Sequence, residues 1–279
     1  MLRVIDALSA PGAVLNEDAW GAVDDAVWVL DGATGVWPEQ RLSADSDAAW
    51  LAREISLAMV QAHDPDSDAS AVLTRAIGAV AEKASGLCDL DAIPPSHLPS
   101  ASFVAARRVE HGIELSNLGD CALLWRADGG SAGRFGSSGV TRLEAEFTAA
   151  LAAHRAVGKT RAQARDAVMD LLRGQRALMN HPDGYWIVDL SGAGAPHVQT
   201  LLLELPVKGE LLLMSDGLYR LVEVFGRYDD DSLMDAAASR GLSDLMAELR
   251  EIERGDPDCE RFDRGKTHDD ATGVLLKVG

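Results

Sequence analysis

Two aspartates in this chain each follow a run of apolar residues and precede a glycine. Asp31 comes directly after the apolar residues 27–30, and Gly32 follows it. Asp216 comes two positions after the apolar residues 211–214, and Gly217 follows it. A charge at the end of a buried strand is costly unless something pairs with it, and glycine lets a backbone approach that partner closely. The two stretches therefore predict that two carboxylates meet in one place, which is how an oxygen-lined site for a divalent metal ion is built.

The composition is that of a globular and strongly acidic chain. Its 279 residues, 47% of them hydrophobic, can bury the core of one large domain or of two small ones. The formal net charge of -18 argues against binding to nucleic acid or to anionic membranes, because both need a basic surface. The same charge repels an anionic substrate unless local cations, such as bound metal ions, oppose it.

The cysteines and the apolar runs indicate a cytoplasmic protein. Cys88, Cys121 and Cys259 are odd in number and far apart, so we expect neither a disulfide framework nor a zinc knuckle. A reducing compartment fits this pattern. Asp6 interrupts the apolar residues near the N-terminus, so we expect no signal peptide, and no apolar run is long enough to span a bilayer.

Periodicity and turn residues predict the elements that position the aspartates. Strands are expected at 2–8, 27–30, 101–107, 113–118, 122–126, 185–190, 198–205, 210–215 and 273–278, and helices at 43–63, 67–87, 218–225, 231–239 and 243–253. Turns are expected at 16–20 and 24–25, a flexible loop at 130–140, and a helical pattern over 143–179 with a break near Gly158. Ser43 is the expected N-cap of the first helix. Without repeats or linkers, residues 1–279 are expected to form one layered α/β or α+β domain.

Four stretches resemble the motifs of the type-2C metal-dependent Ser/Thr protein phosphatases. They read NEDAW at 16–20, VLDGATG at 29–35, LSNLGDC at 115–121 with MSDGLY at 214–219, and HDDATGVLL at 268–276. They follow the family's order and cover the chain nearly end to end. The resemblance implies an α+β fold of four layers, in which helix pairs flank two antiparallel sheets. It also implies a flap-like helical insert at about 141–183.

The resemblance further implies a site for two ions of manganese or magnesium. Its ligands, position by position, are Asp18, Asp31, the backbone carbonyl of Gly32, Asp120, Asp216 and Asp269. Asp31 matches the carboxylate that bridges the ions, and Asp216 and Asp269 match ligands of the first ion. Gly32 matches a ligand of the second ion, and Asp120 an acid of a third, weaker ion. Two such ions activate a water molecule and clamp a phosphoryl group for in-line attack.

The resemblance implies smaller roles for the acidic residues next to these ligands. Asp18 matches an acid that often reaches the metal through water, and Glu17 is its neighbour. Asp270 is not expected to be a ligand. The alternative for every one of these acids is that it is a turn residue.

Several positions depart from the family's pattern. Ala13 stands where a phosphate-binding arginine is usual. Ala33 and Thr34 stand where many relatives carry a histidine proposed to protonate the leaving group. Arg220 stands where a further metal-binding acid is common, which weakens a third ion site.

Two hypotheses address these departures. Arg176 or Arg220 replaces the missing arginine, since an arginine binds phosphate bidentately, and His181 helps to protonate the leaving group. The alternatives are that the arginines of the insert form a solvated face and that His181 is a turn residue before Pro182.

Three functions remain open from the sequence. The leading one is metal-dependent hydrolysis of phosphoserine or phosphothreonine on a protein of unknown identity, and we expect the enzyme to be a monomer. The second is a module of the same fold that has lost efficient catalysis and binds a phosphorylated partner. Ala13 and Arg220 favour this module, and the intact set of Asp31, Asp216 and Asp269 opposes it. The third is hydrolysis of a small phosphorylated molecule.

Overall fold

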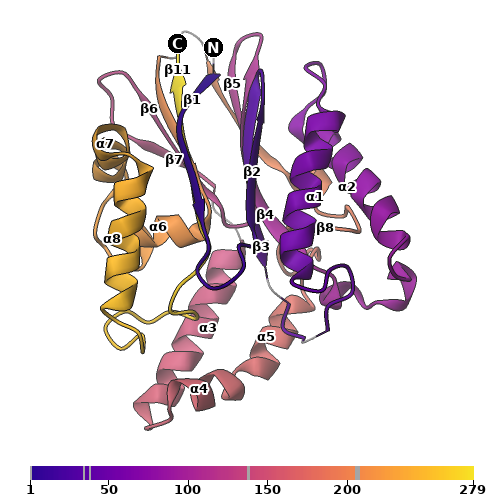
Figure 1. Ribbon diagram of the computed structural model, residues 1–279, viewed down its shortest axis with the longest axis vertical. Coiled ribbons are helices and arrows are strands. Elements are labelled where there is room, and N and C mark those ends of the chain that lie inside the picture. Colours follow the sequence, from indigo (N-terminus) through magenta and orange to yellow (C-terminus); the bar gives the residue numbers. More distant parts are fainter. Residues whose placement is uncertain (1, 34, 38, 137–138, 205–207) are drawn as a thin grey trace.

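Two antiparallel sheets lie face to face between layers of helices (Figure 1). The computed structural model describes residues 2–33, 35–37, 39–136, 139–204 and 208–279. The first sheet has the order β1-β11-β10-β6-β7, with β1 (Leu2–Ala10), β6 (Ala122–Ala127), β7 (Gly133–Phe135), β10 (Gly209–Met214) and β11 (Ala271–Val278). The second has the order β2-β3-β4-β5-β9, with β2 (Asp18–Val23), β3 (Ala26–Ala33), β4 (Ser100–Val109), β5 (Gly112–Leu118) and β9 (Gln199–Glu204). The short β8 (Val188–Asp189) pairs with β4.

Helices cover the outer face of each sheet. The second sheet carries α1 (Asp47–Ala62) and α2 (Ala69–Ser85), and the first carries α6 (Asp216–Glu223), α7 (Asp230–Arg240) and α8 (Leu242–Arg254) (Figure 1). An insert of α3 (Gly139–Ala156), α4 (Arg161–Ala167) and α5 (Met169–Arg176) projects from one end of the sandwich (Figure 1). Short 3-10 turns occur at Leu90–Ala92, Pro95–His97 and Ala195–His197. The expected α+β fold of four layers is confirmed.

Strand alternation on β3 shows how the layers are held together. Val27 and Val29 point between the two sheets and pack with apolar residues of β10 and β11. Trp28 and Leu30 point outward, beneath α1 and α2. All four are at most 3% exposed, because successive side chains of a strand point to opposite faces and both faces of β3 are covered. The indole N–H of Trp28 donates a hydrogen bond to Ser56 Oγ of α1 over 3.0 Å.

Several sequence predictions of local structure were wrong. Ser46, not Ser43, caps α1, and its hydroxyl accepts a hydrogen bond from the backbone N–H of Ala49 over 3.1 Å. Residues 18–20, expected in a turn, begin β2, because β3 offers them a partner strand. Part of the loop expected at 130–140 forms β7, which pairs with the edge of β6. The strand expected at 185–190 is reduced to two residues.

The insert is divided where glycine and a capping residue predict a break. Gly158, with φ of 85°, lies between α3 and α4. Thr160 then starts α4 with a capping box, in which its hydroxyl accepts from the backbone N–H of Gln163 while the Gln163 side chain accepts from the N–H of Thr160. None of the helices within the described ranges combines the length and apolar composition that crossing a bilayer requires.

Candidate functional site

The two Asp-Gly stretches meet at one end of the sandwich, although they belong to different sheets. Asp31 lies near the end of β3, and Asp216 opens α6 after β10. The backbone N–H of Asp216 donates a hydrogen bond to Asp31 Oδ2 over 3.3 Å. The structure thus brings together the two carboxylates that the sequence paired by pattern alone.

Further aspartates arrive from neighbouring strands. Asp18 is the cross-strand partner of Asp31 on β2, and Ser102 is its partner on β4. The Ser102 hydroxyl donates to Asp120 Oδ1, and the backbone N–H of Asp120 donates back to Ser102 Oγ over 3.3 Å. Asp269 closes the group from the loop before β11.

Glycines allow these segments to approach one another. A Cβ on Gly217 would collide with the backbone oxygen of Asp270, so only glycine lets the start of α6 lie against the loop of Asp269. A Cβ on Gly32 would collide with the backbone oxygen of Glu17, which accepts the Gly32 N–H over 3.2 Å. The close partner expected for Gly32 is therefore the backbone of the NEDAW segment.

The assembled carboxylates oppose one another's ionisation. Burial, together with the charges of Asp18 and Asp216, raises the pKa of Asp31 well above its ordinary value. Burial raises the pKa of Asp18 to about 7, although a hydrogen bond from Thr272 opposes the change. Burial and the neighbouring charge of Asp216 raise the pKa of Asp120 to about 6. The pKa of Asp216 is raised by burial and by Asp269. A divalent cation would relieve this repulsion.

One carboxylate oxygen in the group has a free position for a ligand. Thr272 Oγ1 donates to Asp18 Oδ2 over 2.7 Å. Asp18 Oδ1 is buried and has no hydrogen-bond partner among the residues that the structure describes. A buried polar atom without a partner is uncommon in folded proteins and calls for an explanation such as a bound ion.

Asp270 and Glu17 have structural partners. Asp270 accepts the backbone N–H groups of Gly12 and Glu17, each over 2.7 Å, through its two separate oxygens. The Glu17 carboxylate accepts the hydroxyl of Ser46 over 2.5 Å, which links the NEDAW segment to the start of α1. Asp270 thereby ties the segment of residues 12–17 to the start of β11.

Asp269, in contrast, is held by two basic side chains. Arg220 Nη2 donates to Asp269 Oδ2, and Lys266 Nζ donates to Asp269 Oδ1 over 2.8 Å. Burial lowers the pKa of Lys266, but the negative charges of Asp269 and its neighbours outweigh that effect and raise it. Lys266 was missed by sequence reasoning, because nothing in its local pattern distinguishes it from a solvated loop lysine.

The types of ligand atom in the group suit magnesium or manganese, but the positions of the side chains suit these ions less well. All the side-chain donors are carboxylate oxygens, which hard divalent cations prefer, and Asp18 Oδ1 is available. However, within the described ranges no three His, Cys, Asp or Glu side chains lie in an arrangement that would hold an ion. The carboxylate of Asp269 is already engaged by cations, so the half of the site around Asp18 and Asp31 fits better than the half around Asp269.

The residues considered for substrate binding lie in different surroundings. Arg176 is 7% exposed and donates to the backbone oxygens of Ser96 and Leu98 and to Ser100 Oγ over 3.3, 2.8 and 2.9 Å. Its three nitrogen atoms thereby fasten α5 to the start of β4. The side chain of His181 is 55% exposed, and its Nδ1 accepts the N–H of Asp183 over 3.2 Å within a turn.

The positions where the sequence departs from the family's pattern are only partly described. Ala13 lies exposed in the turn after β1, and Ala33 ends β3. Thr34 lies outside the described residues.

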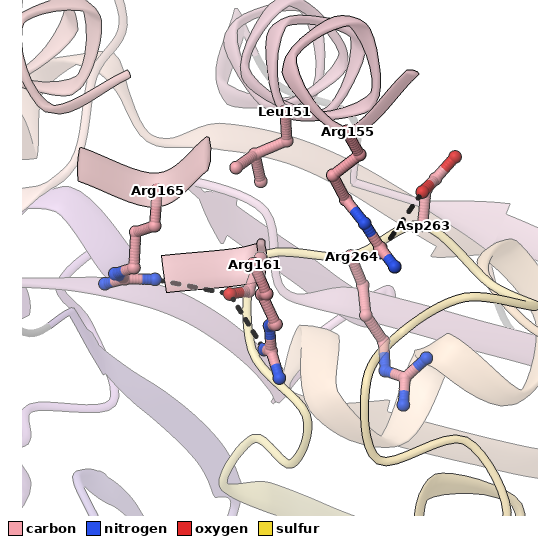
Figure 2. Close-up of a pocket in the computed structure, with 7 residues that line it drawn as sticks. Leu151, Arg155, Arg161, Arg165, Asp263 and Arg264 are labelled. Atoms are coloured by element: carbon pink, nitrogen blue, oxygen red, sulfur yellow. Dashed lines mark hydrogen bonds and ion pairs between the residues drawn. The ribbon is translucent and has the colours of Figure 1, made fainter. Parts of the chain in front are cut away.

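Arginines fasten the insert to the loop that leads to Asp269. Arg161 and Arg165 of α4 donate to the backbone oxygen of Gly265 over 3.3 and 3.2 Å, as Figure 2 shows by two dashed lines. Arg161 also donates to the Thr267 hydroxyl. A small pocket lies between the insert and the loop, and it is lined by Leu151, Arg155, Arg161, Arg165, Asp263, Arg264 and Gly265.

Comparison with known proteins identifies the fold. The serine/threonine phosphatase PstP/Ppp of Mycobacterium tuberculosis has a TM-score of 0.58 and 18% identity, covering 99% of this chain and 98% of that one. The PPM Ser-Thr phosphatase MsPP of Mycobacterium smegmatis has a TM-score of 0.54 and 20% identity, covering 99% of both chains. Stp1 of Staphylococcus aureus has a TM-score of 0.54 and 14% identity, covering 99% of this chain and 96% of that one.

These similarities give 99% of this chain the fold of the PPM-type Ser/Thr phosphatases. No model of a protein family matches the sequence, and no curated protein sequence matches it either. At 14 to 20% identity the fold is what the three structures share with this chain.

Proposed function

We propose that this chain hydrolyses phosphoserine and phosphothreonine monoesters on proteins in a reaction that depends on manganese or magnesium. The observation that carries the proposal is the hydrogen bond from the backbone N–H of Asp216 to the Asp31 carboxylate, which brings two half-buried acidic residues from opposite sheets together. The fold shared with Ser/Thr phosphatases supports the same reaction. The catalytic domain of PstP has been solved with two manganese ions, which supports a divalent metal here.

The proposed ligands divide into two halves. Asp18, Asp31 and the Gly32 carbonyl form one half, and Asp216 and Asp269 form the other. Asp120 lies beside Asp216 and contributes negative charge to the group. A bound ion would lower the pKa of a coordinated water molecule and withdraw charge from the phosphoryl group. The protein's own part is to hold the carboxylates at fixed positions, where a bound cation would favour their ionised form.

Arg220 is the better placed of the two arginines proposed to contact phosphate. It lies within the carboxylate group, on Asp269, whereas Arg176 donates to backbone and serine oxygens at the start of β4. We therefore propose that Arg220 has the role that the sequence left open between the two.

Hydrolysis of a phosphothreonine peptide and of a chromogenic aryl phosphate tests the proposal. Activity is expected with manganese, and EDTA and the Asp216→Asn substitution should each abolish it. Asp170→Asn is a matched control, because the Asp170 side chain is 95% exposed on α5. Free phosphorylated metabolites should be poorer substrates than the peptide. Their preferential hydrolysis would redirect the proposal to small molecules.

One observation favours a second function, a module that binds phosphorylated proteins without efficient hydrolysis. Asp269 is engaged by Arg220 and Lys266, and two basic side chains within the group suit the binding of a phosphate. This function would be supported if the phosphopeptide bound tightly while neither substrate turned over with manganese.

A further inference from the structure

Both oxygens of Asp269 are occupied by the protein's own cations. Arg220 reaches Oδ2 from α6, one helical turn after Asp216, and Lys266 reaches Oδ1 from the loop before β11. The backbone N–H of Asp270 also donates to Oδ1 over 3.2 Å. The side chains of Arg220 and Asp269 are only 10% and 14% exposed, so little water screens the pair.

Arg220 is not needed to balance its other acidic neighbour. Glu253 of α8 is fully buried and lies 3.7 Å from Arg220 Nη1. Arg250 lies closer to Glu253, with a separation of 2.7 Å between Nη1 and Oε2. Since Glu253 has this second arginine as a partner, the positive charge of Arg220 is available to Asp269.

Among the residues that the structure describes, none places a cation on the open oxygen of Asp18, in the opposite half of the site. Asp18 Oδ1 is buried without a hydrogen-bond partner in the described part of the chain, and Asp18 Oδ2 is held by the neutral hydroxyl of Thr272. The two halves therefore differ in what they offer an ion. One presents an unengaged carboxylate oxygen, and the other presents a carboxylate that two cations already neutralise.

We propose that Arg220 and Lys266 take the place of one metal ion, so that this chain binds a single manganese tightly, on the side of Asp18 and Asp31. A second divalent ion at Asp216 and Asp269 would have to displace two basic side chains from Asp269 and would be repelled by them. This inference rests on the proposed metal site, but it concerns the number of ions and not the reaction.

Manganese titration measures that number directly. Isothermal titration calorimetry should show one tight manganese site per chain in the native protein. Electron paramagnetic resonance of the free manganese ion gives an independent count of the bound ions. In Lys266→Ala, and more strongly in Arg220→Ala with Lys266→Ala, a second site should tighten by on the order of tenfold or more, because a neighbouring positive charge is removed. Lys277→Ala, an exposed lysine on β11, is the matched control and should leave both sites unchanged.

Two results would overturn the inference. One is two manganese sites of similar affinity in the native protein. The other is a second site that stays equally weak in a folded Lys266→Ala protein, whose substituted side chain is 46% exposed and therefore easily replaced. The measurement is independent of hydrolysis. If the protein binds one manganese ion but does not hydrolyse the phosphopeptide, the proposed function is wrong and this inference holds. If it hydrolyses the phosphopeptide and binds two manganese ions tightly, the proposed function holds and this inference is wrong.

Discussion

Asp216 donates its backbone N–H to the carboxylate of Asp31 across 185 positions of sequence. Asp31 belongs to one sheet, and Asp216 follows the central β10 of the other. The contact therefore forms only when the two sheets are packed face to face. The candidate site is for this reason a product of the whole sandwich and not of any one motif.

Asp31→Asn should raise the stability of the metal-free protein and lower its activity. The substitution removes a buried charge that its neighbours oppose, so the metal-free protein should melt a few degrees higher. Activity on a phosphopeptide should fall by at least about a hundredfold, because a proposed ligand of the manganese ion is lost. Thermal unfolding in EDTA and kcat/KM with manganese measure the two effects. A variant that is less stable without metal would contradict the account of mutual repulsion.

Manganese should stabilise the folded protein. An ion that binds only the folded state at about 100 times its Kd adds about 2.7 kcal/mol to the free energy of unfolding. Differential scanning calorimetry should therefore show a rise in Tm with added manganese. The rise should be absent in Asp31→Asn and unchanged in Asp170→Asn. An equal rise in all three proteins would place the ion elsewhere.

Arg176→Ala should weaken the fold more than substrate binding. Three hydrogen bonds from a charged group are lost, two of them buried, with an expected cost of about 2–4 kcal/mol in the free energy of unfolding. Urea unfolding measures this cost. Arg173→Ala on the same helix is the control, since the Arg173 side chain is 46% exposed and pairs only with Asp170 among the described residues. A raised KM with unchanged stability would instead make Arg176 the phosphate-binding arginine.

The ion pair between Asp256 and Arg264 should make the free energy of unfolding depend on pH. Burial alone would raise the pKa of Asp256, but hydrogen bonds from Arg264 and from backbone N–H groups outweigh it and lower the pKa to about 2. In the unfolded chain the pKa is about 4. The stabilisation is therefore complete above about pH 4 and is lost as the pH falls toward 2. The difference in unfolding free energy between native protein and Asp256→Asn, on the order of 1–2 kcal/mol at pH 5, should shrink by pH 2.5.

The arrangement of layers could be predicted because local signals agree with it. Apolar runs, capping residues and the order of the four motifs all indicate the same fold. The elements that escaped prediction, β2 and β7, are defined by a partner strand and not by their own residues. Asp18 was consequently expected in a turn, although it lies opposite Asp31 on a strand.

The sequence predicted the acidic residues of the candidate site better than it predicted the basic residues that contact them. Strand ends with Asp-Gly reveal Asp31 and Asp216 by pattern. Lys266 lies in a charged loop that contacts the insert, and Arg220 stands where the family's pattern has an acid. Their convergence on Asp269 depends on tertiary packing, which no local pattern encodes.

The attachment of the insert to Gly265 has a mechanical consequence. Arg161 and Arg165 share the backbone oxygen of Gly265, which lies directly before Lys266 and four positions before Asp269. A displacement of α4 is thus transmitted along a few backbone bonds to the lysine and the aspartate together. The position of α4 and the position of the ion pair on Asp269 are therefore linked through one backbone oxygen.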